Sequence, residues 1–357
     1  MKIFHCHNCS NPVYFENTHC EKCQSQLGYL SETNDLVVLE PSENAWQTKP
    51  DSGKLYKYCE NHSYNACNWL VALEDMGEEG LCEACDLNRT IPYLQVEHQL
   101  QEWLRLERAK HRLIYTLKRF NLPLVSKNED PENGLAFDFL SADNLKNPKN
   151  GIKTGHFKGL ITINIAEADP VHREYMRTQM EERYRTLLGH FRHEVGHYYW
   201  ERLILTDEKI LADFRAIFGD ETQDYGVALQ NHYENGPPAD WAKTFVSKYA
   251  ASHAWEDWAE SWSHYLHIID TLETAYAFGL QIDPDNTKNS PLYMQANFDP
   301  FEEKDFDRII GACLPLTFAV NSLNRSMGQP DLYPFILPPP VIEKLRFIHK
   351  LLKGQFN

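Results

Sequence analysis

Two histidines and a glutamate stand at metal-site spacing in the stretch LLGHFRHEVGHYYW, residues 187–200. His193 and His197 are four residues apart, so on a helix their imidazoles lie on one face and can share one ion. Glu194 would lie about 100° round the helix from His193, beside the ion but not on it. A general base must occupy such a place to take a proton from a metal-activated water. The pattern H-E-x-x-H is short, however, and it also occurs on ordinary helices.

The residues inside the pattern predict how its helix packs. Val195 falls on the face opposite the two imidazoles, where it should point toward the core. Gly196 is a poor helix former that costs about 1 kcal/mol relative to Ala, so its presence indicates close packing against another element. That element is a candidate source of a further ligand.

The third ligand is expected on a second helix. A catalytic zinc usually has three protein ligands and an open fourth position. A histidine six residues after His197 would indicate a metzincin, but that position is Leu203. The other common solution is a glutamate on another helix, and the best candidate is HAWEDWAESWSHYLHIIDTL, residues 253–272. Residues 206–248, before this helix, have no predicted role.

Two glutamates four residues apart are expected to have different roles on this second helix. We assign Glu256 to zinc, with Asp257 and His253 as the alternatives. Glu260 is assigned to the free ring N–H of a ligating imidazole, a contact that orients histidine ligands. The helix should face the core through another stripe, formed by Trp255, Trp258, Trp262 and Leu266.

Cysteines at metal-ligand spacing fill the N-terminal part of the chain. Of the 9 cysteines, all but Cys313 precede residue 86, and Cys313 is interpreted as a small core residue. The first four form two C-x2-C pairs around SNPVYFENTH, where Val-Tyr-Phe predicts a strand of a hairpin. This pattern is typical of a zinc ribbon with one structural ion. The predicted ligands are Cys6, Cys9, Cys20 and Cys23.

A second, less regular set of cysteines predicts a second structural zinc site. His62 is an alternative to the first cysteine of this set, because an imidazole is an equally good zinc ligand. Residues 31–54, between the two sets, are polar with two prolines and one short apolar strand, so they are expected to be a connector. The expected ligands are Cys59, Cys67, Cys82 and Cys85.

Periodicity along the chain predicts an α+β fold with two parts. Residues 1–92 are expected to form a tandem zinc-ribbon unit with two four-cysteine sites, and residues 93–357 a helix-rich zincin-like domain with a small sheet. Residues 96–120 repeat apolar side chains at intervals of three and four, which predicts an amphipathic helix. Residues 159–165 alternate in a strand-like pattern with one apolar face.

Composition narrows the expected partners and location. A formal net charge of −16 argues against a nucleic-acid partner, since binding phosphates requires clustered Lys and Arg. No apolar run reaches the roughly 18 residues of a membrane span. The N-terminus MKIFHCHNCS lacks the apolar stretch of a secretory signal, so a cytoplasmic protein with no membrane partner is expected.

Several of these segments together resemble a known family. GLITINIAEADP, YRTLLGHFRHEVGHYYW and YAASHAWEDWAESWSHYLHIIDTL, behind the ribbon CHNCSNPVYFENTHCEKC, are similar to the bacterial zinc-ribbon metallopeptidases. The C-terminal segment also resembles the gluzincin arrangement of anthrax lethal factor and the Pro-Pro endopeptidases. In those enzymes a tyrosine seven residues before the glutamate ligand stabilises the oxyanion. The resemblance implies that role for Tyr249.

Together these features predict a zinc metallo-endopeptidase with one catalytic and two structural zinc ions. His193, His197 and Glu256 would hold the catalytic ion, while Glu194 would take a proton from its water and pass it to the leaving amine. The strand at residues 159–165 is expected to be a sheet edge on which a peptide substrate adds. The alternative is a scaffold whose zinc ribbons bind a protein partner and whose H-E-x-x-H helix is not catalytic.

Overall fold

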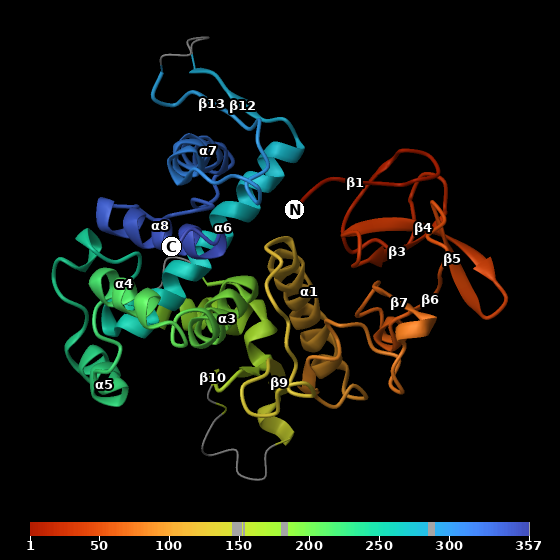
Figure 1. Cartoon of the computed structure of the whole chain (residues 1–357), viewed down its shortest axis with the longest axis horizontal. Helices are drawn as coiled ribbons and strands as arrows, with labels where there is room; N and C mark the ends of the chain where they lie inside the picture. Colours follow the sequence, from red (N-terminus) through yellow and green to blue (C-terminus); the bar gives the residue numbers. More distant parts are fainter. Residues whose placement is uncertain (145–151, 153, 180–184, 285–289, 357) are drawn as a thin grey trace. The chain divides into compact units, whose positions relative to one another are not determined.

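The chain forms two compact units in this computed structural model (Figure 1). One unit holds Lys2–Arg173, and the other holds Glu174–Asn357 together with Met1. Each unit has its own buried core. The domain boundary expected at residue 92 stays a prediction. The structure describes residues 1–144, 152, 154–179, 185–284 and 290–356.

An antiparallel meander forms the N-terminal part of the first unit. Strands β3 to β7 pair in chain order, and their buried side chains form an apolar cluster around Tyr56. A separate short hairpin pairs β1 with β2. The strands are β1 Phe4–His5, β2 Pro12–Val13, β3 Gln26–Leu30, β4 Asp35–Ser42, β5 Ala45–Lys49, β6 Leu55–Tyr58 and β7 Leu70–Ala72.

Two expectations for this region are wrong. Residues 31–54 are not a connector, because they supply β4 and β5 to the meander. The one short apolar strand expected there is present as β4, which buries four consecutive apolar side chains, residues 36–39, on both faces of the sheet. Of the Val-Tyr-Phe segment, only Val13 belongs to a strand. That strand, β2, pairs antiparallel with β1, which precedes it in the chain.

A long helix and a four-stranded sheet complete the first unit. Helix α1, Glu97–Arg119, confirms the amphipathic helix expected over residues 96–120. The sheet has the order β10-β11-β9-β8, with β11 parallel to β9 and antiparallel to β10. The remaining elements are β8 Asn88–Thr90, β9 Ala136–Leu140, β10 Gly155–Phe157, β11 Leu160–Asn164 and α2 Pro170–Gln179, which extends into the second unit.

The strand expected to receive substrate is not at the edge of its sheet. β11 confirms a strand at this point of the chain, but it is hydrogen-bonded to neighbours on both sides. Its backbone groups are therefore already paired, and β10 occupies the edge instead. The sequence did not reveal this, because the short β10 lacks a clear alternating pattern of its own.

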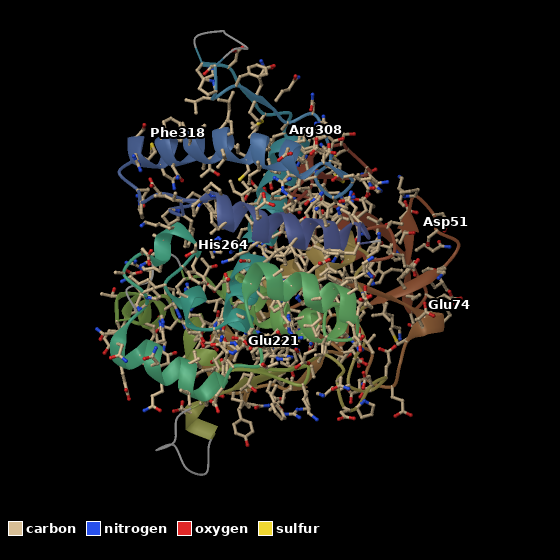
Figure 2. The ribbon with its side chains drawn as sticks, turned by 60° about the vertical axis from the view of Figure 1, so that its left-hand side comes forward. Asp51, Glu74, Glu221, His264, Arg308 and Phe318 are labelled. Atoms are coloured by element: carbon tan, nitrogen blue, oxygen red, sulfur yellow. The ribbon has the colours of Figure 1, made fainter. Side chains whose placement is uncertain are left out.

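Helices dominate the second unit, where α3 and α6 pack side by side and α4, α7 and α8 pack against α6. Figure 2 labels His264 on α6 and Phe318 on α7. The imidazole Nδ1 of His264 lies 2.7 Å from the hydroxyl of Tyr333, which follows α7. The elements are α3 Leu187–Leu203, α4 Glu208–Phe218, α5 Tyr225–Asn235, α6 Ala254–Ala277, α7 Phe306–Ser326, α8 Pro339–Leu352, and the hairpin strands β12 Gln281–Ile282 and β13 Met294–Gln295.

The mixed composition of strands and helices confirms the expected α+β class. Strands dominate the N-terminal region, and helices with small sheets follow. Within the described residues, no helix is both long and apolar enough to cross a membrane.

Candidate metal centre

Helix α3 brings the two histidines of the H-E-x-x-H pattern together. The helix begins after Thr186, whose hydroxyl accepts a hydrogen bond from the backbone N–H of Gly189 at 3.0 Å. The Nε2 atoms of His193 and His197 lie 3.2 Å apart, and both side chains are buried. Val195 is fully buried on the other face, as expected.

Helix α6 brings a carboxylate to these imidazoles. The Oε2 atom of Glu256 lies 3.0 Å from Nε2 of His193 and 3.5 Å from Nε2 of His197. Tetrahedral zinc with bonds of about 2.0–2.2 Å needs ligand atoms roughly 3.3 Å apart, so this triangle fits one ion. Within the described chain, Oε2 is buried and no hydrogen-bond donor is aligned with it. A metal ion bound to Oε2 would supply the partner that this oxygen lacks among the described residues.

The two alternatives to Glu256 have other partners. The Nδ1 atom of His253 accepts a hydrogen bond from the backbone N–H of Trp255 and so caps α6. The Oδ2 atom of Asp257 lies 2.6 Å from Nζ of Lys344 on α8, in a buried ion pair. Neither residue belongs to the group formed by the two histidines and Glu256.

Gly196 lets α3 approach α6 closely. A Cβ atom at Gly196 would lie 3.1 Å from Cδ1 of Trp262 and 3.2 Å from Cα of Ala259. The carbonyl of Gly196 also accepts a hydrogen bond from the indole N–H of Trp258 at 2.8 Å. The close packing expected at this glycine is therefore present, and it sets the separation between the histidines and Glu256.

Glu260 contacts the far side of the first histidine. Its Oε1 atom lies 2.8 Å from Nδ1 of His193, so the ring presents Nε2 to the proposed ion. Burial alone would lower the pKa of His193, but Glu256 and Glu260 outweigh it and raise the pKa well above the usual value. The two carboxylates thus favour a positive charge at this point, which either a proton or a metal ion can supply.

The carboxylate of Glu194 is held by a histidine one turn earlier. Nε2 of His190 lies 3.1 Å from Oε1 of Glu194. Burial would raise the pKa of Glu194, but the hydrogen bond from His190 and the neighbouring imidazoles outweigh it and lower the pKa. Glu194 is therefore ionised at neutral pH, as a proton acceptor must be.

Aromatic side chains surround the triangle. Tyr249 begins the short 3-10 helix η7, Tyr249–Ser252, and its ring centroid lies 5.9 Å from that of His193. The hydroxyl of Tyr225, at the start of α5, donates a hydrogen bond to Oε1 of Glu256 at 2.6 Å. Trp255 was expected in the core, but it is only partly buried and lies over His197 at 3.9 Å between centroids. The other three members of that stripe are fully buried.

The first cysteine set forms a group suited to zinc. Its four Sγ atoms lie within 4.8 Å of one another. Sγ of Cys6 lies 3.5 Å from Sγ of Cys23, and Sγ of Cys9 lies 3.6 Å from Sγ of Cys20. Tetrahedral zinc at about 2.3 Å per bond requires sulfurs roughly 3.8 Å apart, so the site fits a structural ion.

The second cysteine set forms a buried group of the same kind. Cys59, Cys67, Cys82 and Cys85 converge, and all four side chains are buried. His62 lies outside this group: its ring stacks on Tyr58 at 3.8 Å, and its Nδ1 contacts the carbonyl of Cys67 at 2.9 Å. The four-cysteine alternative is therefore the one the structure brings together. Cys313 is also buried, as expected of a core residue.

Charged residues of α1 lie unexpectedly beside this second set. Glu107 and Lys110 are fully buried and form an ion pair at 3.0 Å. Nε2 of His111 lies 3.6 Å from Sγ of Cys85, which also lies 3.9 Å from a carboxylate oxygen of Glu107. The sequence pattern of α1 gave no sign that these charges point inward.

Sequence reasoning missed three side chains around the candidate catalytic metal site. His190 had a detectable signal, because it stands four residues before Glu194 and so shares its helix face. Tyr225 and Ser247 had none. They lie in or next to loops, and only the fold brings them to α6. The segment 206–248, which had no predicted role, contains both.

Comparison with known proteins identifies the family. The chain is 43% identical over 352 residues to uncharacterized proteins of Mycobacterium tuberculosis (strain ATCC 25618 / H37Rv) and Mycobacterium bovis, covering 99% of this chain and 95% of theirs. No solved structure matches it. A zinc-ribbon domain model matches residues 3–96, and the model "Putative zinc-binding metallo-peptidase" matches residues 99–351. The expected zinc-ribbon region and the resemblance are thus confirmed, and the chain belongs to this zinc-binding metallo-peptidase family, with a zinc ribbon at its N-terminus.

Proposed function

We propose that this protein is a zinc-dependent endopeptidase of the gluzincin type. The observation that carries the proposal is the triangle of His193 Nε2, His197 Nε2 and Glu256 Oε2, with sides of 3.0 to 3.5 Å. Three donors leave one tetrahedral position open, whereas each cysteine group offers four. This contrast supports one catalytic and two structural zinc ions.

The side chains around the triangle supply proton transfer. Zinc, when bound, would supply a Lewis acid that polarises a peptide carbonyl and makes water more acidic. Glu194, ionised and oriented by His190, accepts one proton from the attacking water as the oxygen bonds to the carbonyl carbon. It then gives this proton to the leaving amine as the C–N bond breaks. The carboxylate is thereby restored.

Tyr249 is proposed to stabilise the negative charge on the carbonyl oxygen. Its ring lies beside that of His193, with 5.9 Å between the two centroids. Burial, together with the negative charge of Glu256, raises the pKa of Tyr249. The phenol therefore keeps its proton at neutral pH and can donate a hydrogen bond to the oxyanion.

Glu194→Gln tests this function. The amide keeps the size of the side chain but cannot accept the proton, so cleavage of fluorescently labelled, unfolded casein should fall by about 10²–10⁴-fold. Zinc content should match that of the wild type, because Glu194 is not one of the three ligands. Equal cleavage by Glu194→Gln and the wild type would contradict the mechanism. A lack of cleavage of casein and of a mixed peptide library by the zinc-loaded wild type would favour the scaffold alternative.

A further inference from the structure

Tyr225 forms a hydrogen bond with one of the two carboxylate oxygens of Glu256. Glu256 uses its two oxygens differently: Oε2 faces the imidazoles, while Oε1 accepts the hydrogen bond from Tyr225 at 2.6 Å. This bond occupies Oε1 and leaves Oε2 as the oxygen available to an ion. A glutamate held in this way binds through a single oxygen, which preserves room for other ligands.

Ser247 holds the second carboxylate of α6 in a comparable way. Its hydroxyl donates to Oε2 of Glu260 at 2.6 Å and accepts from the backbone N–H of Ala250 at 3.0 Å. The other oxygen of Glu260 contacts Nδ1 of His193 at 2.8 Å. A chain of hydrogen bonds therefore runs from the backbone of η7 through two side chains to an expected zinc ligand.

We propose that the segment 225–252 is part of the zinc site, with Tyr225 and Ser247 as positioning residues that set zinc affinity. Tyr225 fixes Glu256, and Ser247 fixes His193 through Glu260. The inference rests on zinc binding at the proposed site but not on peptidase activity. It gives a role to residues that carry no recognisable metal-binding pattern.

The position of α5 should in turn depend on zinc. α5 has no fully buried side chain, so few contacts hold it in place. Its first residue, Tyr225, packs against Trp255 and His253 at 5.7 and 5.4 Å between ring centroids. Glu221, labelled in Figure 2, lies in the turn before α5, and its Oε2 accepts a hydrogen bond from Nε of Arg215 on α4 at 2.9 Å. Binding energies are reciprocal, so a helix that strengthens zinc binding is itself stabilised by zinc.

Zinc affinity measures the proposal directly. Tyr225→Phe and Ser247→Ala each remove one hydroxyl, and each should weaken zinc binding at this site by about 10–100-fold in competition with a chromophoric chelator. Tyr276→Phe is the matched control: Tyr276 lies near the C-terminal end of α6, outside the segment 225–252, and is 41% exposed, so the zinc affinity of this variant should equal that of the wild type. The zinc of this site is identified as the ion that His197→Ala lacks.

Affinities within twofold of the wild type in both Tyr225→Phe and Ser247→Ala would overturn the proposal, whatever the peptidase assay shows. A second measurement needs no variant. Hydrogen exchange in the amides of α5 and η7 should slow by at least tenfold when zinc is added to metal-free protein, relative to α7. Equal exchange with and without zinc would also overturn the proposal. If both zinc effects appear but casein is not cleaved, the proposed function fails and this inference stands.

Discussion

Replacing Gly196 with Ala tests the helix contact on which the proposed site depends. A Cβ atom there would lie 3.1 Å from Cδ1 of Trp262 and 3.2 Å from Cα of Ala259. The ring of Trp262 is fully buried and stacks on Tyr199 at 5.3 Å between centroids, and the Cα atom of Ala259 moves only if α6 moves. Gly311→Ala in α7 is the matched control, because its Cβ would meet no heavy atom within 4 Å of it.

The two substitutions should change stability in opposite directions. Gly-to-Ala in a helix stabilises by up to about 1 kcal/mol, and Gly311→Ala should show this gain. Gly196→Ala has the same gain but also overpacks a contact, which costs about 1–3 kcal/mol. We therefore expect a free energy of unfolding up to about 2 kcal/mol below that of the wild type, and about 1–3 kcal/mol below that of Gly311→Ala.

Urea unfolding of the zinc-loaded protein measures this difference. Tryptophan fluorescence reports on the contact, because Trp258 and Trp262 lie in it. The slope of the free energy of unfolding against urea concentration should be unchanged, so the substitutions should shift only the urea concentration at the unfolding midpoint. If Gly196→Ala stabilises the protein as much as Gly311→Ala does, α3 and α6 are not in close contact at this point, and the separation of the proposed ligands is wrong.

Three further substitutions test polar groups of the second unit. Lys344→Met should lower the free energy of unfolding by about 3 kcal/mol in urea titrations, because Asp257 loses its buried cation. An unchanged free energy of unfolding would contradict the ion pair. Burial lowers the pKa of His349 to about 4. Between about pH 6.5 and pH 4 the unfolded chain therefore binds a proton at His349 that the folded chain does not. The free energy of unfolding should fall as the pH falls through this range, by up to about 3 kcal/mol. In His349→Gln this fall should be less steep. His190→Ala should slow casein cleavage by about tenfold with zinc retained, since Glu194 loses the hydrogen bond that orients it; an unchanged rate would exclude that role.

Local spacing predicted the residues that helices bring together. The four-residue interval between His193 and His197 places them on one face before any tertiary contact forms. Gly196 indicated a close neighbour, and a Cβ there would indeed crowd α6. Short cysteine spacings likewise placed pairs of expected ligands on single turns. Such signals depend only on the geometry of one helix or turn, so they can be read from the sequence.

Features set by tertiary packing could not be read in the same way. The single apolar strand expected within residues 31–54 gave no sign of β5 or of the meander, because the pairing of β4 with β3 and β5 depends on tertiary contacts. β11 gave a clear strand pattern, but its place inside the sheet depends on a short neighbour. Tyr225 stands 31 residues before the glutamate it contacts, and no periodic pattern spans that interval. The inward charges Glu107 and Lys110 depend on each other and on the cysteine group beside them.

A crystal structure of the zinc-loaded protein, with anomalous data on both sides of the zinc absorption edge, shows whether two histidines and one glutamate hold a zinc ion. We expect an anomalous peak about 2 Å from His193 Nε2, His197 Nε2 and Glu256 Oε2, with no fourth protein ligand. Two further peaks should lie within the cysteine groups. Peaks at the cysteines alone, or a fourth side chain closing the histidine site, would contradict a catalytic zinc.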